Sequence, residues 1–117
     1  MLVNKLLVIG AIATIGFSMP ALADSGSELA KRSHQLSVNM KHSAQLEQND
    51  FCKTKLSEAS AFAEEAKTWY LRDHTFLGRE LMKAVSTDLE RTSDKDCSEK
   101  LSITVHKQEA DSIISVS

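Results

Sequence analysis

The sequence predicts an all-α protein, a small bundle of three to four helices built on a disulfide-closed helical hairpin. Small and apolar residues recur at helical spacing over two long segments, 51–72 and 76–91. Two cysteines, Cys52 and Cys97, flank these segments. The 117-residue chain has one proline and four glycines, and it contains no linker or internal repeat that would indicate a second domain.

The N-terminal segment predicts a cleaved signal peptide, residues 1–23. Lys5 supplies a positive charge, an apolar run follows over 6–17, and small residues stand in Ala21-Leu22-Ala23 where signal peptidase accepts them. The alternative is an uncleaved membrane anchor, but the apolar run falls short of the roughly 20 residues that span a bilayer. We therefore expect cleavage before Asp24, one exported domain over residues 24–117, a bacterial periplasmic location, and no stable membrane insertion after cleavage.

The charge balance argues against nucleic acid as a partner. The predicted mature chain carries 13 basic and 16 acidic side chains, a formal charge of −3, and signs are mixed along it. Protonation of four histidines in mild acid would move the charge to about +1, because an ordinary imidazole titrates near 6.5. The alternative is that four scattered surface histidines titrate without consequence. The histidines are His34, His42, His74 and His106.

The two cysteines are predicted to bond to each other. Export places Cys52 and Cys97 in an oxidising compartment, and two cysteines allow a single intramolecular pairing. A zinc site would need about four ligands, and no other cysteine or histidine lies within five residues of either one. A redox motif would need Cys-x-x-Cys, which is absent. The sequence therefore predicts a disulfide, with neither metal nor cofactor.

The first helix is expected to begin at Ser25, which forms a capping box with Glu28. Its apolar residues are sparse, so we expect a peripheral or partly ordered helix. From Leu29 the apolar positions on one face are Leu36, Met40 and Ala44, with Val38 and Leu46 displaced around the axis.

The strongest amphipathic pattern predicts a helix over residues 51–72, with Asp50, after Asn49, as its N-cap. Phe62 and Trp69 widen its apolar stripe. We expect Trp69 and Phe62 to belong to the core, together with other large side chains near the bend. The stripe itself alternates spacings of four and three, through Cys52, Leu56, Ala59, Ala63, Ala66 and Tyr70.

A second hairpin helix is predicted over residues 76–91, capped by Asp73 or Thr75. We expect Phe76 and Leu77 to lie in the core near the bend. At 1.5 Å per residue the two helices differ in length by about 7 Å, which the linker 92–96 spans easily, so Cys97 can return to Cys52. The apolar series of the second helix is Leu77, Leu81, Val85 and Leu89.

The last segment, residues 98–117, carries two conflicting patterns. Leu101, Ile103 and Val105 alternate as in a strand, but a lone strand would have no partner, so we predict a helix over 96–111 or beyond. Its helical series is Cys97, Leu101, Val105, Gln108 and Ser112. The terminal apolar residues are either core contacts or an exposed tail; they are Ile113, Ile114 and Val116.

Motifs specific to a reaction are absent from the sequence. No serine stands in a Gly-x-Ser-x-Gly elbow, and no glycine-rich loop could cradle a phosphate. His34 and His42 are too far apart along one helix to share a metal. Asp73 and His74 pair a carboxylate with an imidazole, which we interpret as a helix cap beside an exposed histidine. The sequence therefore predicts a protein that is not an enzyme.

The layout resembles that of the acid-stress periplasmic chaperones of the HdeA type: a signal peptide, about 90 mature residues, and two cysteines some 45 residues apart flanking helices. Helical pilotins of secretion systems and periplasmic immunity proteins share this outline. We expect a non-enzymatic periplasmic accessory protein that binds a protein partner of an envelope system, of the secretion, transfer or inhibitor/immunity type. The alternative is an acid-stress chaperone of the HdeA type. The outline also allows a homodimer, and it does not identify partner-binding residues.

Overall fold

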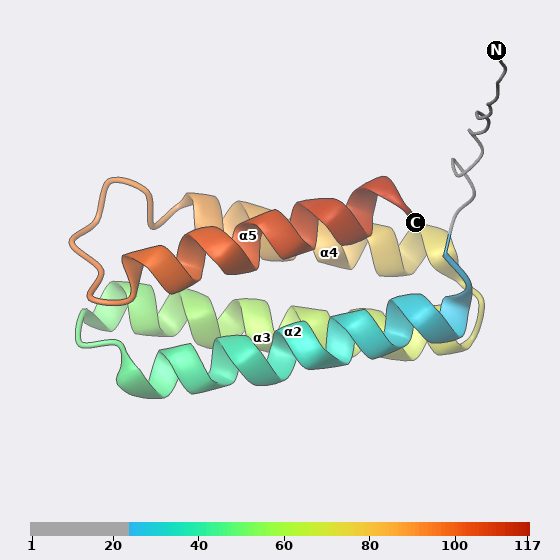
Figure 1. Cartoon of the computed structure of the whole chain (residues 1–117), viewed down its shortest axis with the longest axis horizontal. Helices are drawn as coiled ribbons and strands as arrows, with labels where there is room; N and C mark the ends of the chain where they lie inside the picture. Colours follow the sequence, from blue (N-terminus) through green and yellow to red (C-terminus); the bar gives the residue numbers. More distant parts are fainter. Residues whose placement is uncertain (1–23) are drawn as a thin grey trace, which may run out of the picture.

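Four helices run alternately up and down and enclose a shared core (Figure 1). The computed structural model describes residues 24–117, so the predicted signal peptide and its cleavage site lie outside the described residues. This part of the chain contains no strand, which confirms the all-α prediction. Each helix contacts two neighbours around the bundle. The helices are α2 (Gly26–Leu46), α3 (Asp50–Leu71), α4 (Thr75–Glu90) and α5 (Lys100–Ser115).

Helix α2 begins as predicted, because the Ser25 hydroxyl accepts a hydrogen bond from the Glu28 amide at 3.2 Å. The expectation that it is peripheral or partly ordered is wrong. Its inward face packs against α3 and α5. Three of the buried positions on this face are serines, which a pattern of apolar residues does not include. The buried residues of α2 are Leu29, Ala30, Ser33, Leu36, Ser37, Met40, Ser43 and Ala44.

Helix α3 buries the predicted stripe, from Cys52 to Tyr70, with all six of its residues inaccessible to solvent. Phe62 packs against this core while remaining half-buried. The predicted N-cap is wrong by one residue: the side chain of Asn49 accepts the Cys52 amide at 3.0 Å, and Asp50 begins the helix.

The bend between α3 and α4 differs from the expected cap. Asp73 adopts a left-handed backbone with φ of 60°, and its amide bonds to the Tyr70 carbonyl at 3.0 Å. It therefore ends α3. His74 occupies the N-cap position of α4 without a side-chain cap, so neither Asp73 nor Thr75 caps this helix.

Helix α4 turns inward nearly the face that was predicted, with a shift of one position in its first turns. Val85 and Leu89 are buried as expected, but Leu77 is exposed. Gly78 takes the inward position instead, because a Cβ there would approach the Tyr70 ring to within 3 Å. The inward series of α4 is Gly78, Met82, Val85 and Leu89.

Helix α5 confirms helix rather than strand, but it begins at Lys100 and shows the opposite face to the core. Leu101 and Val105 of the predicted series are exposed. Cys97 lies in the preceding loop, so its position could not set the phase of the helix. The buried residues of α5 are Ile103, His106, Ala110 and Ile113. Ile114 and Val116 also pack against the core, which settles the tail as core contacts.

The two ends of the described chain meet at the bend end of the bundle. The Asp24 amide donates a hydrogen bond to the Val116 carbonyl at 3.0 Å. The Tyr70 hydroxyl and the Ser117 hydroxyl lie 3.0 Å apart and link the end of α3 to the C-terminus. The α3–α4 bend, the start of α2 and the end of α5 therefore form one end of the molecule.

Candidate functional site

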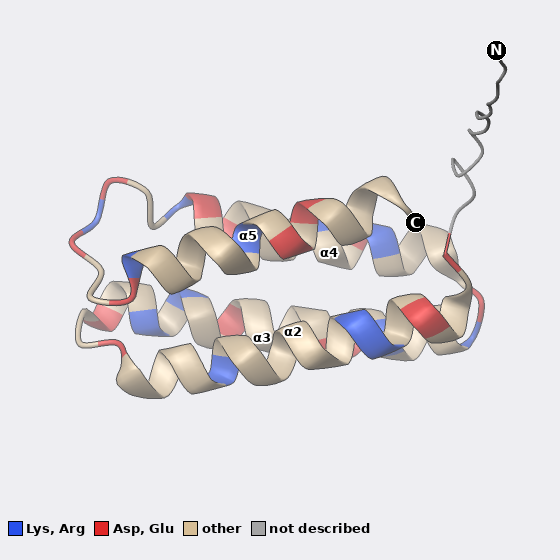
Figure 2. Cartoon of the chain, in the orientation of Figure 1, with Lys and Arg blue, Asp and Glu red and all other residues tan. Residues whose placement is uncertain are grey.

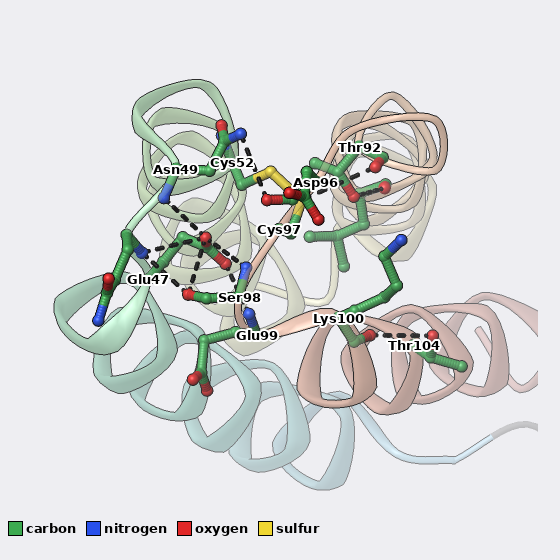
Figure 3. The surroundings of a disulfide bond; sticks show 12 residues. Glu47, Asn49, Cys52, Thr92, Asp96, Cys97, Ser98, Glu99, Lys100 and Thr104 are labelled. Carbon is green, nitrogen blue, oxygen red and sulfur yellow. Dashed lines mark hydrogen bonds between the residues drawn. A yellow bond between two sulfur atoms is a disulfide. The ribbon is translucent and has the colours of Figure 1, made fainter.

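The opposite end of the bundle is closed by the disulfide between Cys52 and Cys97 (Figure 3). Cys52 lies in the first turn of α3, and Cys97 lies in the loop that leads to α5. Their Cα atoms are 5.8 Å apart, and both side chains are buried. The bond joins the open ends of the α3–α4 hairpin, as the predicted helix lengths require.

Glu47 lies beside the disulfide and connects three segments of the chain (Figure 3). Its side chain is only 2 % exposed. One carboxylate oxygen accepts the Asn49 amide at 2.9 Å and the Ser98 amide at 2.8 Å, and the other accepts the Glu99 amide at 2.9 Å. The Gln48 amide and the Ser98 hydroxyl also donate to Glu47. The carboxylate therefore holds the end of α2, the start of α3 and the segment before α5 together.

Hydrogen bonding keeps Glu47 ionised despite its burial. Burial alone raises the pKa of a carboxyl, but the amides of Asn49, Ser98 and Glu99 and the Ser98 hydroxyl lower it by more. The pKa of Glu47 therefore lies below its ordinary value. Sequence reasoning missed this residue, because a glutamate near the end of a helix usually points into solvent.

The side chains at this end do not form a metal site while Cys52 and Cys97 are bonded to each other. Within residues 24–117 the structure brings together one group of three side chains of metal-ligating type, Glu47, Cys52 and Cys97. The two sulfur atoms are bonded to each other, so only the carboxylate remains as a ligand, and it is already saturated with hydrogen-bond donors.

Comparison with known proteins gives no family assignment. No protein-family model, curated protein or solved structure matches the chain. Function is therefore inferred from the side chains themselves.

The four histidines fall into two groups. His34, His42 and His74 are exposed; His34 lies 3.0 Å from Glu64, and the His74 ring stands edge-on to Trp69 at 5.4 Å. His106 is buried between α2 and α5, so the alternative of four surface histidines is wrong for this residue. His42 is exposed and Met40 buried, so these side chains face different ways, as their spacing predicts.

His106 and Ser43 form a buried polar contact between α5 and α2. The His106 Nε2 atom lies 2.8 Å from the Ser43 hydroxyl. Burial lowers the pKa of His106, and the negative charge of Glu99 opposes this only in part. The neutral imidazole is thus the form that the folded chain favours. Sequence reasoning missed this contact, because its two residues are far apart in the chain.

Asp88 is a buried carboxylate at the α3–α4 seam. It is only 5 % exposed, and its Oδ2 atom has no hydrogen-bond partner among the described residues. Burial, helped by the negative charge of Glu58, raises the pKa of Asp88, while Lys55 and Arg91 lower it by less. The folded chain therefore binds a proton at Asp88 more readily than the unfolded chain does.

The bend end carries large apolar side chains that the sequence placed in the core. Tyr70 is buried as expected and Trp69 is half-buried, but Phe76 is 62 % exposed, so that expectation is wrong for Phe76. Leu71 and Leu77 are exposed beside it. These side chains protrude at the tip of the hairpin, because the core there is filled by the ring of Tyr70 against α4.

Between Lys100 and Lys107 the outward face of α5 is free of Lys, Arg, Asp and Glu. Leu101 is 85 % exposed and Val105 59 % exposed, one helical turn apart. In Figure 2 no charged position interrupts α5 between Lys100 and Lys107. We call this surface the outer stripe of α5; its residues are Leu101, Thr104, Val105, Gln108 and Ser112.

Ion pairs lie on either side of the outer stripe. Toward α4, Lys107 contacts Glu90 at 3.6 Å. Toward α2, Glu109 accepts a hydrogen bond from Arg32 at 3.0 Å. A groove of about 470 Å³ lies along the α2 side and is lined in part by Val105. The arrangement is an apolar strip with a charged border, as at protein interfaces.

Over residues 24–117, no helix combines the length with the apolar composition that a bilayer requires.

Proposed function

We propose that the protein is a non-enzymatic accessory protein of the bacterial periplasm that binds a protein partner of an envelope system through the outer stripe of α5. The observation that carries the proposal is the exposure of Leu101 and Val105 on an uncharged helix face. Two exposed apolar side chains one helical turn apart offer a contact surface for the apolar part of a partner. The surface suits an apolar helix or loop of a partner, with polar residues that meet the flanking ion pairs.

The one serine–histidine contact in the described chain supports a binding role over catalysis. Ser43 and His106 have the separation of a nucleophile and its base, but both side chains are buried in the α2–α5 seam, Ser43 with 5 % and His106 with 8 % of its surface exposed. No carboxylate among the described residues is hydrogen-bonded to His106, so no third group orients the ring. The pair serves to join two helices.

The test compares two double variants, each of which replaces two exposed apolar residues by Gln. In the first, Leu101 and Val105 are both changed to Gln; in the control, the exposed Val38 and Leu71 are changed to Gln. Each is used as bait in a periplasmic extract of the native host after its thermal unfolding has been shown to match the wild type. We expect the first variant to lose the protein that the wild type retains, and the control to keep it. Equal retention by both variants would refute the outer stripe as the binding surface.

A second candidate, the acid-stress chaperone, is favoured by one observation. The buried, neutral His106 is a group that mild acid would charge inside the fold. A chaperone of this kind should expose apolar surface as the pH falls, which a fluorescent hydrophobic dye would detect. A partner-binding protein that stays closed should show no such rise.

A further inference from the structure

We infer that mild acid loosens α5 from the bundle while α2, α3 and α4 stay packed. Helix α5 would then cover the core in a pH-dependent way and would stay attached to the bundle through the disulfide at Cys97. The inference stands on the chemistry of the helix seams and does not depend on the identity of a partner. Each seam is held by a different kind of contact, and the α2–α5 seam contains the buried histidine, His106, whose charging in mild acid would weaken it.

The α2–α3 seam relies mainly on groups that do not titrate. The Ser37 hydroxyl donates to the Ser60 carbonyl, and the Ser60 hydroxyl donates to the Ser37 carbonyl, each at 2.9 Å and each buried. The surface pair His34 and Glu64 crosses the same seam at 3.0 Å. Both side chains of this pair are exposed, so the buried serine contacts dominate the polar part of the seam.

The α3–α4 seam also resists acid. The disulfide closes it at one end, and the Tyr70 ring packs directly on Gly78 at the other. Asp88 lies within this seam with an unpartnered carboxylate oxygen. Its protonation removes a buried charge, so acid stabilises the seam rather than opening it.

Helix α5 is attached differently. In the described chain, every side-chain hydrogen bond or ion pair from α5 to another helix includes an ionisable group. These contacts join His106 to Ser43, Glu109 and Ser112 to Arg32, Lys107 to Glu90, and Asp111 to Ser86. Its buried apolar residues are Ile103, Ala110 and Ile113, and Ile114 packs against the core beside them.

His106 responds to acid first. His106 lines the groove on the α2 side of α5, together with two cations of α2, Lys31 and Arg32. Arg32 is already paired with Glu109. On the side of α5, Glu99 adds a negative charge that favours the imidazolium only weakly.

Helices α3 and α4 each contribute one buried ionisable side chain, Tyr70 and Asp88 respectively. Neither side chain changes the pKa of His106. A protonated His106 would therefore be a buried cation without a carboxylate partner. Because the pKa of His106 lies below its ordinary value, the stability it contributes falls as the pH drops below about 6.5.

Glu47 responds at lower pH. It anchors the start of α5 by accepting the Ser98 and Glu99 amides, and no charged group contributes to its lowered pKa. This anchor is lost only as the pH falls below the ordinary carboxyl range, through the lower pKa of the folded state. Cys97 remains bonded to Cys52 throughout, so α5 stays tethered at its N-terminal end.

Amide hydrogen exchange tests the inference helix by helix. From about pH 7 to about pH 5, we expect protection in α5 to fall by about tenfold or more after correction for the intrinsic rate, whereas α2 and α3 change little. Equal loss in all four helices would mean global unfolding and would overturn the inference. Unchanged protection of α5 would overturn it as well.

His106→Gln keeps a hydrogen-bonding group toward Ser43 but cannot be charged. We expect this variant to hold α5 closed at about pH 5, and the matched control His42→Gln, at an exposed site on α2, to open like the wild type. A His106→Gln protein as acid-sensitive as the wild type would refute the role of His106.

If that variant fails to fold, NMR titration of the wild-type imidazole decides instead. The His106 ring must then titrate below its ordinary value, in step with the α5 amide signals. A ring that titrates at or above the ordinary value would count against the inference.

Discussion

The Glu47 carboxylate accepts the backbone amide of Glu99 at 2.9 Å, across 52 residues of sequence. This bond ties the end of α2 to the residue that precedes α5, beside the disulfide that ties α3 to the same segment. Two contacts of different chemistry, a hydrogen bond to an ionised carboxylate and a covalent bond, therefore fix the α4–α5 loop at its exit. The covalent bond is insensitive to pH in this range, whereas the hydrogen bond weakens when the carboxylate is protonated.

Glu47→Gln should destabilise the protein by about 2–3 kcal/mol at pH 7, because a buried acceptor loses its charge while its donors remain. The folded state holds the pKa of Glu47 below its ordinary value, so its stabilisation is complete above that value and is lost as the pH falls through the folded pKa. Urea unfolding at pH 7 and at about pH 3 measures this directly. Glu65→Gln, at an exposed site on α3, is the control. A difference in unfolding free energy between wild type and Glu47→Gln that stays constant with pH would contradict the role of Glu47 as an ionised hydrogen-bond acceptor.

Replacing both Cys52 and Cys97 by Ala should cost about 4 kcal/mol and lower the melting temperature by on the order of 20 °C. The bond closes a segment with a sequence separation of 45, which restricts the unfolded chain. Differential scanning calorimetry gives the shift. Counting thiols in the native purified protein should find none, and two free thiols would refute the pairing.

Ala63→Leu should cost about 1–3 kcal/mol, since Ala63 is fully buried and the added carbons would overpack the seam. Ala61→Leu, at an exposed position on the same helix, provides a matched control and should leave the melting temperature nearly unchanged. Equal behaviour of the two variants would place Ala63 outside the core.

Asp88→Asn should raise stability at pH 7 by about 1 kcal/mol, because it removes a buried charge with an unpartnered oxygen. The folded state raises the pKa of Asp88, so the wild type loses stability as the pH rises through the carboxyl range. The advantage of the variant should therefore shrink toward about pH 4, as chemical denaturation at several pH values would show. Asp94→Asn, in the exposed loop, should have no comparable effect. An Asp88→Asn protein that is less stable than the wild type at pH 7 would show that the ionised carboxylate is needed.

If the chain is exported and cleaved by signal peptidase as proposed, the mature protein should begin at Asp24. Mass spectrometry of the protein from a periplasmic fraction should give the mass of residues 24–117. Recovery of the chain with Met1 retained would contradict cleavage.

The sequence predicted the α3 stripe correctly because six positions from Cys52 to Tyr70 follow one helical phase without a competing series. It failed on α5, where Leu101 and Val105 on one face and Ile103 and Ala110 on another both have helical spacing. Packing of α5 against α2 and α4 decides which face turns inward, and that is a tertiary constraint.

The polar contacts were beyond sequence reasoning for a related reason. A glutamate at the end of α2 and a histidine within α5 have no local pattern that marks burial. Their partners, Ser98 and Ser43, lie 51 and 63 residues away. The N-cap of α3 was missed by one position because Asn49 and Asp50 both have side chains suited to capping.

The meeting of Asp24 with Val116 has a consequence for the order of folding. The disulfide makes a closed ring of α3 and α4, and α2 and α5 are arms on either side of it. The side-chain contacts between the two arms join residues up to 80 positions apart. Loop closure over such separations is slow relative to contacts between consecutive helices. We predict that the contact between the two arms forms last, so that substitutions at Ser43 or Arg32 speed unfolding and leave the refolding rate nearly unchanged. Stopped-flow kinetics that showed slowed refolding for these variants would place the arm contact in the transition state instead.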